Sequence, residues 1–282
     1  MDKRKIKKEY LSKITLLETY NKSYYDKSNP IVNDETYDKL KKTIFSLENK
    51  HFFLNSKKSP SKTVGYKPSK NFQKMSHRVQ MLSLANAFGK EDLINFEKRL
   101  LNFLSKNEDF KLTYSAEPKI DGTSASLIYK NGEFKTGLSR GDGKEGEDIT
   151  ANIETIKDIP KKIQSKDFPK EIDIRGEVFI QNSDFEKLKE KFANPRNAAS
   201  GSLRQKNSED TKKIPLKFIA YTYGYEKGLK VQNQINFLKN LDRWGFKTNP
   251  LNKLVTGVDN LLNNYDKIEK DRTKIDFDID GI

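Results

Sequence analysis

The sequence contains no cysteine, and His51 and His77 are its only histidines among 282 residues. The absence of cysteine excludes disulfides, thiol catalysis and a cysteine-based zinc site. Two histidines are too few for a histidine-built metal centre and argue against a His-dependent catalytic triad. We therefore predict no zinc site in this chain, and we assign no residue as a metal ligand.

Long apolar runs are also missing. No stretch approaches the roughly 20 apolar residues that a membrane-spanning helix needs. The first five residues, MDKRK, lead into an amphipathic helical pattern and do not resemble a signal peptide. We expect a cytoplasmic protein with no membrane partner.

Acidic residues are outnumbered by basic ones. The chain has 54 Lys and Arg against 40 Asp and Glu, a formal net charge of +14. Such an excess favours a polyanionic partner such as nucleic acid, although a lysine-rich proteome would produce the same excess. The hydrophobic fraction is only 34%, yet 17 Phe and 12 Tyr can fill a core. We expect a globular monomer.

Two helical patterns open the chain. Apolar residues recur at helical spacing from Ile6 to Leu17, and a second helix begins near Asn33 or Asp34, either of which could cap it. Residues 54–74 are rich in Ser, Pro and Lys, as is typical of an extended linker. The predicted domains are residues 1–70, a small helical domain with its linker, and residues 71–282.

The larger predicted domain mixes strands with helices. Asn131-Gly132 is typical of a hairpin turn, and Asn194-Pro195 is typical of a helix start. The mixture predicts an α+β fold. Expected strands cover residues 112–116, 124–129, 133–138, 172–180, 216–223 and a last one from 276; expected helices cover 90–104, 147–156, 183–191, 232–244 and 258–271.

Residues 117–122, EPKIDG, combine the groups of a compact nucleophile site. Two residues apart on one strand, Glu117, Lys119 and Asp121 would point to the same face. Gly122 would then let the chain turn. Taken alone, such a stretch is better explained as a surface salt bridge at a strand end. Motifs elsewhere in the chain are needed to favour a nucleophile site over a salt bridge.

The remaining motifs resemble those of bacterial NAD-dependent DNA ligases, specifically the small helical domain and the nucleotidyltransferase (adenylation) domain. They run in the family's order over nearly the whole chain. The K-x-D-G element alone is shared with ATP-dependent ligases and mRNA-capping enzymes, so the N-terminal helical hairpin is what selects NAD. The stretches are residues 34–38, 81–84, 117–122, 140–143, 175–179, 192–205, 243–246 and 278–281.

The resemblance implies an ATP-grasp-like nucleotidyltransferase fold, with antiparallel sheets and flanking helices, after the helical hairpin domain. It also implies that Lys119 attacks NAD, becomes Lys-AMP and releases nicotinamide mononucleotide. AMP then passes to a 5′-phosphate at a DNA nick and a 3′-hydroxyl closes it, in replication and repair of DNA damage. A lysine attacks only as the free amine, which burial or a nearby cation can supply. Magnesium would neutralise phosphate charge.

Individual roles follow from the resemblance by position. Glu117 reads the adenine edge, Tyr221 stacks on the ring and Glu177 holds the ribose hydroxyls. Asp121 and Asp280 lie near the reacting lysine and either orient it or bind metal. The resemblance also places Arg140 against the sugar-phosphate, and Ser83 and Leu84 in the lining of the nucleotide pocket. It assigns phosphates of the nucleotide or of DNA to three arginines, Arg196, Arg204 and Arg272. The residues implied to bind the nicotinamide end are Tyr24, Asp34, Tyr37 and Asp38.

Structural explanations remain open for several of these residues. Asp34 could be only a helix cap, and Tyr37 lies on the apolar stripe of its helix. Tyr221 lies in an aromatic strand, where core packing is the default. Arg196 could bridge loops, and Glu177 could pair with Arg175.

Three departures from the family pattern bear on activity. Tyr25 stands where the family has a histidine, and Gln80 replaces a proline. The chain stops at Ile282, inside an expected strand, so we expect a fragment or truncated reading frame that does not seal nicks unaided. The alternatives are a catalytically impaired nucleic-acid-binding chain, or an ATP-using RNA ligase or capping-like enzyme, which the hairpin disfavours.

Overall fold

The computed structural model describes residues 3–25, 31–32, 34–54, 56, 59 and 72–282, without the side chains of residues 24, 25, 34 and 35. The chain divides into two compact units. The N-terminal unit is Met1–Ser83 with Arg140–Asp148, and the larger unit is Leu84–Ser139 with Ile149–Ile282. The domain boundary after residue 70 stays a prediction.

Two helices of the N-terminal unit pack through their apolar faces. Helix α1 (Lys3–Tyr25) and helix α2 (Asp34–Lys50) confirm the two predicted helical patterns. Tyr10 donates a hydrogen bond to Glu48 Oε1 at 2.6 Å, and its burial raises the pKa of its hydroxyl to about 12. The cluster between the helices contains Ile6, Tyr10, Ile14, Leu17, Ile44 and Leu54.

The same unit contains a short strand pair. Strand β1 (Lys74–Ser76) pairs antiparallel with β6 (Glu145–Glu147). The helix predicted over 147–156 is therefore wrong, because Glu147 pairs with Lys74 across a sequence gap that no local pattern reveals. Helix α4 covers only Thr150–Ile153. After α4, the buried Ile153, Ile156 and Ile159 follow one another in single turns.

A four-stranded antiparallel sheet forms the centre of the larger unit, in the order β5-β4-β7-β8. Its strands are β4 (Thr123–Lys130), β5 (Glu133–Ser139), β7 (Glu171–Phe179) and β8 (Lys217–Lys227). Asn131 and Gly132 join β4 to β5 with φ of 51° and 76°, as a two-residue hairpin turn requires. The four predicted strands and the hairpin are confirmed.

The two faces of this sheet differ in polarity. Leu127 lies opposite Ile174, and both are fully buried. On the other face Ser124 lies opposite Glu177, and Ser126 lies opposite Arg175. These polar side chains come from alternate positions of strands that are hydrophobic on their other side, so the sheet presents one polar face to a candidate site.

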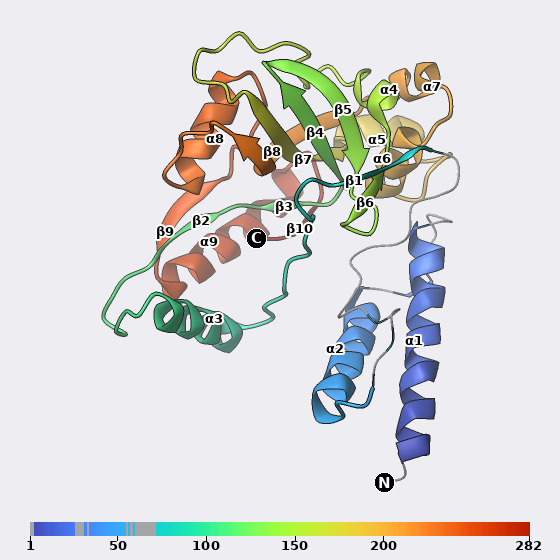
Figure 1. Ribbon diagram of the computed structural model, residues 1–282, viewed down its shortest axis with the longest axis vertical. Coiled ribbons are helices and arrows are strands. Elements are labelled where there is room, and N and C mark those ends of the chain that lie inside the picture. Colours follow the sequence, from blue (N-terminus) through green and yellow to red (C-terminus); the bar gives the residue numbers. More distant parts are fainter. Residues whose placement is uncertain (1–2, 26–30, 33, 55, 57–58, 60–71) are drawn as a thin grey trace. The chain divides into compact units, whose positions relative to one another are not determined.

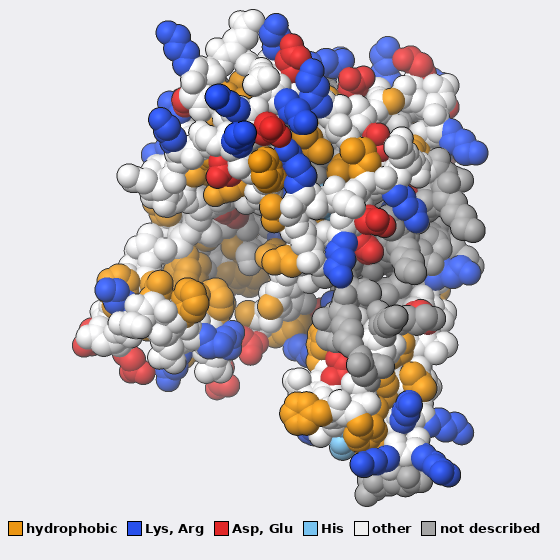
Figure 2. Space-filling model, in the orientation of Figure 1, with side chains coloured by type: hydrophobic (Ala, Val, Ile, Leu, Met, Phe, Trp, Pro, Cys, Tyr) orange, Lys and Arg blue, Asp and Glu red, His pale blue; other side chains and the backbone are white. Residues whose placement is uncertain are grey.

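Helices cover the sheet and extend the larger unit (Figure 1). Helix α6 packs against β7 and β4, and α8 packs against β8. Lys and Arg side chains are scattered among acidic and apolar ones over the face that Figure 2 shows. The helices are α3 (Lys90–Phe103), α5 (Asn182–Phe185), α6 (Pro195–Leu203), α7 (Ser208–Lys212), α8 (Gln234–Arg243) and α9 (Val258–Asp271), with short 3-10 turns at η1 (Glu186–Leu188) and η2 (Arg272–Lys274).

Two predicted elements end or begin elsewhere. The helix expected over 183–191 is one turn of α5 followed by η1. The last strand, β10 (Ile279–Gly281), begins three residues later than expected. Near the expected start of this strand, Asp276 instead contacts the first turn of α5: its side chain accepts from Ser183 N at 2.8 Å and Ser183 Oγ at 2.7 Å, and its carbonyl accepts from Asn182 N at 2.9 Å.

Two further strand pairs complete the larger unit. Strand β2 (Thr113–Ala116) pairs with β9 (Lys253–Thr256), and β3 (Lys119–Ile120) pairs with β10. All of these pairings are antiparallel, as the predicted fold class requires.

Candidate active site

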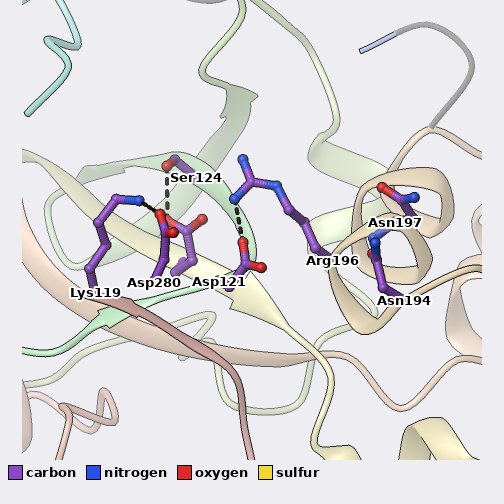
Figure 3. A network of polar contacts seen from close by, with 8 residues as sticks. Lys119, Asp121, Ser124, Asn194, Arg196, Asn197 and Asp280 are labelled. Atoms are coloured by element: carbon purple, nitrogen blue, oxygen red, sulfur yellow. Dashed lines mark hydrogen bonds and ion pairs between the residues drawn. The ribbon is translucent and has the colours of Figure 1, made fainter. Parts of the chain in front are cut away.

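Lys119 is placed by the pairing of β3 with β10. This pairing brings Asp280, 161 residues later in the chain, against Lys119, and the two side chains form an ion pair (Figure 3). Lys119 is 44% exposed, so the lysine is accessible. The amine therefore lies beside a carboxylate at the surface of the unit, and is not sequestered in the core.

The expected single strand carrying Glu117, Lys119 and Asp121 is wrong. Strand β2 ends at Ala116 and β3 covers only Lys119–Ile120, with Pro118 in the break between them. Proline has no N–H to donate to a strand ladder, which favours an interruption there. Because of the break, each of the three side chains finds a different partner.

Asp121 is held by Arg196. The Arg196 Nη1 and Asp121 Oδ1 atoms are 2.5 Å apart (Figure 3). Asp121 N donates to the Asp278 carbonyl at 2.9 Å. Arg196 lies in the first turn of α6, where the Asn194 side chain accepts from Asn197 N at 2.7 Å. The ion pair thus ties the helix start to the turn after Lys119, as the structural alternative for Arg196 would also have it.

Glu117 faces a small set of hydrogen-bond donors. Ser115 Oγ donates to one carboxylate oxygen at 2.8 Å and Gln234 Nε2 to the other at 3.3 Å. Gln234 Nε2 also donates to the Tyr221 carbonyl at 2.7 Å. Gln234 was not among the predicted site residues. It is the first residue of α8, and it contacts Glu117, just after β2, and Tyr221 in β8; contacts between such distant segments leave no motif in the sequence.

Tyr221 occupies an irregular position in β8. Arg175 pairs with Thr222 whereas Gly176 pairs with Ala220, so Tyr221 is the extra residue of a β-bulge. Bulges re-aim a side chain and are common beside active sites. Tyr221 is half-buried and does not belong to the fully buried core of the sheet.

Glu177 lies on the polar face of the sheet and is 9% exposed. Ser124 Oγ donates to Glu177 Oε2 at 2.8 Å. A Cβ on Gly122 would lie 2.4 Å from the Val178 carbonyl oxygen and 2.9 Å from Glu177 Cγ. Only glycine therefore allows the turn after Asp121 to pass over β7 at this distance.

Arg175 is a buried cation next to this group. Burial lowers the pKa of its guanidinium, and the charges of Asp173 and Tyr221 act in the opposite direction. A Cβ at Gly224 would come within 2.6 Å of Arg175 Nη2. Strand β8 can therefore pass close to the Arg175 guanidinium because residue 224 is a glycine. The guanidinium places a positive charge on the polar face of the sheet.

The remaining predicted residues are dispersed. Arg140 belongs to the N-terminal unit, where its carbonyl accepts from His77 Nε2 at 3.1 Å. Ser83 is exposed in that unit, and Leu84 is 75% exposed in the larger one, so neither is seen lining a pocket within its unit. Arg204 caps the C-terminus of α6, and the exposed Arg272 opens η2.

On the helical hairpin, Tyr37 donates to Asn21 Oδ1 at 2.7 Å, and Lys41 Nζ lies 5.5 Å from its ring centre. Asp38 is half-buried on α2. The side chains of Tyr24 and Asp34, and that of Tyr25, lie outside the described residues. The nicotinamide contacts assigned to this unit stay predictions.

Within the described ranges, no three or more His, Cys, Asp or Glu side chains gather closely enough to hold a metal ion. Asp280 and Asp121 are the carboxylates that meet cations near Lys119. No helix in the described part of the chain has the length and apolar character needed to cross a membrane.

The antiparallel sheet with a polar face, the flanking helices and the Lys119–Asp280 pair agree with the nucleotidyltransferase class of domain that the sequence predicts. Comparison with known proteins narrows the class. The model of the NAD-dependent DNA ligase adenylation domain family matches residues 69–282, and the model of the DNA ligase-like, N-terminal NAD+-binding domain matches residues 3–65. The chain belongs to the family of NAD-dependent DNA ligase adenylation domains.

Relatives with the name DNA ligase support this assignment. The DNA ligase of Pelagibacter ubique (strain HTCC1062) is 63% identical over 282 residues, which is 100% of this chain and 42% of the relative. The DNA ligase of Bradyrhizobium sp. (strain ORS 278) is 44% identical over 274 residues, 94% of this chain and 38% of the relative. The chain thus spans less than half the length of these curated relatives.

The environment of Glu117 predicts a pH effect on stability. Burial raises the pKa of Glu117, and hydrogen bonds from Ser115 and Gln234 lower it in part. The folded state therefore binds more protons than the unfolded state above the ordinary value of 4.5, and the free energy of unfolding falls as pH rises through that window. Glu117→Gln should flatten this decline.

Urea unfolding at about pH 5 and about pH 7 measures the effect. The matched control is Glu154→Gln, at an exposed position after α4, which should keep the parent's pH dependence. An unchanged decline in Glu117→Gln would contradict the role of burial.

Proposed function

We propose that this chain performs the first step of an NAD-dependent DNA ligase, the transfer of AMP from NAD to Lys119. The observation that carries the proposal is the β3–β10 pairing, which presents an accessible Lys119 beside Asp280 in a chain of this family. The reaction forms a phosphoramidate, which requires a lysine in that position.

In this step Lys119 Nζ attacks the α-phosphorus of NAD. A P–N bond forms, the P–O bond to the second phosphate breaks, and nicotinamide mononucleotide leaves with the bonding electron pair. The amine must lose a proton before it attacks, and Asp280 is the acceptor already in contact with it. Asp121, held by Arg196, fixes the turn that follows the nucleophile.

The polar groups of the larger unit suit an adenosine. The Glu117 carboxylate is an acceptor for the adenine amino group, and Gln234 orients it. Glu177 is an acceptor for ribose hydroxyls, with Ser124 holding its other oxygen. Tyr221, re-aimed by the bulge, stacks on the base. Sequence resemblance adds Leu84 to the pocket and Arg196, Arg204 and Arg272 to phosphates.

The N-terminal unit carries the other proposed contacts. Arg140 and Ser83 are assigned to the nucleotide, and Tyr24, Asp34, Tyr37 and Asp38 to the nicotinamide end, each by resemblance alone. Tyr37 also packs between the hairpin helices, so its substitution would affect packing as well as binding.

Magnesium fits the donors near Lys119. Mg²⁺ commonly uses one or two carboxylates together with substrate phosphates and water. Asp280 and Asp121 are the carboxylates that would hold it, and when bound it neutralises charge on the phosphates. No further protein ligand is assigned.

The later steps are proposed from the family. AMP would pass to the 5′-phosphate of nicked double-stranded DNA, and a 3′-hydroxyl would displace it, in replication and repair. We also propose that the chain acts in the cytoplasm and as a monomer. The excess of basic residues, +14, suits such a partner.

Intact-mass measurement after incubation with NAD and magnesium tests the proposal, with ATP in a parallel sample. A mass gain of one AMP from NAD alone, located on Lys119, is expected. A gain from ATP would place the chain with ATP-dependent nucleotidyltransferases. No gain from either would contradict the proposed activity of this chain and leave its family assignment intact.

A further inference from the structure

Gln234, the first residue of α8, connects two groups of the proposed adenosine site. Its Nε2 donates to the Tyr221 carbonyl oxygen at 2.7 Å and to Glu117 Oε2 at 3.3 Å. Both partners are acceptors, so only the NH₂ end of the amide can face them. The side chain therefore has one fixed orientation, and it joins the segment after β2 to the bulge of β8.

The start of α8 holds Gln234 in place. The Asn233 side chain accepts from Asn236 N at 3.0 Å, which caps the first turn of the helix. One turn further on, the fully buried Phe237 packs against Tyr223 of β8, with ring centres 4.7 Å apart. Gln234 thus belongs to a helix start that is anchored on β8.

The carboxylate of Glu117 is held at both of its oxygens. Ser115 Oγ donates to Oε1 at 2.8 Å, while Gln234 Nε2 donates to Oε2. A carboxylate oxygen has room for a second donor, so capacity remains for a ligand. Burial raises the pKa of Glu117, and both hydrogen bonds act against that shift, which favours the charged form. The two donors therefore fix both the direction and the charge of this acceptor.

An acceptor held in this way distinguishes purines by the group at position 6 of the ring. Adenine carries an amino group there, which donates to a carboxylate. Hypoxanthine carries a carbonyl oxygen, whose lone pairs would face those of Glu117, and its donor N1–H lies at the neighbouring ring position. A carboxylate that is free to swing can follow that donor, whereas one held at both oxygens cannot.

We propose that Gln234 is a specificity-determining residue, which makes the site selective for a 6-aminopurine dinucleotide by holding the Glu117 carboxylate in place. Gln234 is a positioning residue, and no contact with the base is assigned to it. The inference rests on the proposed function, which supplies Glu117 as the acceptor for the adenine amino group. A polar group fixed in one geometry rejects an analogue that lacks the matching hydrogen-bond group, because the fixed group is then left unpaired.

Gln234→Met tests this role, because methionine is also long and unbranched but has no N–H to donate. The parent and the variant are compared with NAD and with nicotinamide hypoxanthine dinucleotide, and the initial rate of nucleotide mass gain is followed over a range of concentrations. The parent should prefer NAD by at least about a hundredfold. In Gln234→Met this preference should fall about tenfold, the order expected for one lost hydrogen bond to a charged group.

Gln232→Met is the matched control. Gln232 is an exposed glutamine two positions before Gln234 and outside α8, so its substitution should keep the parent's preference. A purely structural role of Gln234 would slow the reaction of both dinucleotides by the same factor. An unchanged preference in Gln234→Met, or an equal loss in both variants, would therefore overturn the proposal.

A second variant guards against a folding defect. Gln234→Asn keeps an amide at the helix start but is one methylene shorter, so it should reach Glu117 poorly and show the same loss of preference. Melting temperatures of both variants are compared with that of the parent. If Gln234→Asn folds at the parent's temperature and keeps the full preference for NAD, the proposal is wrong.

Equilibrium binding separates this inference from the proposed reaction. Calorimetric titration of the parent and Gln234→Met with each dinucleotide, without magnesium, measures base preference and needs no AMP transfer. If the parent gains no AMP but binds NAD preferentially, and Gln234→Met loses that preference, the adenylation proposal fails and this inference stands. A parent that gains AMP but binds both dinucleotides equally would overturn the inference and leave the reaction intact. A parent that binds neither would overturn both.

Discussion

Replacing Lys119 by alanine is expected to abolish the AMP mass gain from NAD. The side chain is the proposed nucleophile, and no other group can form the phosphoramidate at that position. Loss of a covalent nucleophile lowers rates by about a thousandfold or more, which places the product below detection. Intact-mass measurement with NAD and magnesium is the readout.

Lys119→Arg is the matched control. It keeps a cation for Asp280 and removes only the nucleophilic amine, so it should also gain no AMP while unfolding at the parent's temperature. DNA binding should be nearly unchanged in both variants, because each alters at most one of 54 basic residues. This comparison also separates an enzyme from a chain that only binds nucleic acid. AMP on another residue of Lys119→Ala would contradict the assignment.

The second large effect is expected from Gly122→Ala. Its Cβ would lie 2.4 Å from the Val178 carbonyl oxygen, and that backbone atom cannot rotate away. Overpacking of this kind costs roughly 1–3 kcal/mol of unfolding free energy. The same Cβ would lie 2.9 Å from Glu177 Cγ, so the carboxylate must move as well. We expect at least about a tenfold slower AMP gain, since about 1.4 kcal/mol in the barrier suffices for that.

Gly201→Ala is the control for adding a methyl group. Gly201 lies inside α6, and its new Cβ would meet only Phe192 Cε1 at an ordinary 3.5 Å. Alanine is favoured over glycine in a helix by about 0.5–1 kcal/mol, so this variant should unfold at higher urea concentration than the parent. Urea unfolding of both variants checks the pair. If Gly122→Ala were as stable as Gly201→Ala, the close approach over β7 would not constrain the site.

Local patterns in the sequence predicted the helices and strands that depend on contacts between near neighbours in the chain. The helices α1, α2, α3, α8 and α9 follow from apolar residues at helical spacing, and the β4–β5 hairpin from Asn131-Gly132. The failures came where a distant segment overrides the local signal. Residues 145–147 join β1 as a strand, and Asp276 contacts the first turn of α5 where a strand was expected to begin.

The site shows the same division. Lys119, Glu117 and Glu177 stand out in the sequence because their motifs are local. Their contacts come from distant segments: Asp280 reaches Lys119 from 161 residues away, as the resemblance implied, and Arg196 reaches Asp121 from 75 residues away, a pair that the sequence did not predict. Gln234 and the bulge at Tyr221 have no sequence signal, because each depends on which residues face one another across strands.

The sequence by itself determined the family and the alternation of polar and apolar residues that gives the central sheet one polar face. These depend on residue type and on spacing along the chain, which a single sequence contains. Only the tertiary structure decided that EPKIDG is broken at Pro118, so that its three charged side chains take separate partners. Strand pairing and ion pairs between distant segments fixed that outcome, because such contacts are set by packing of the whole unit and not by near neighbours.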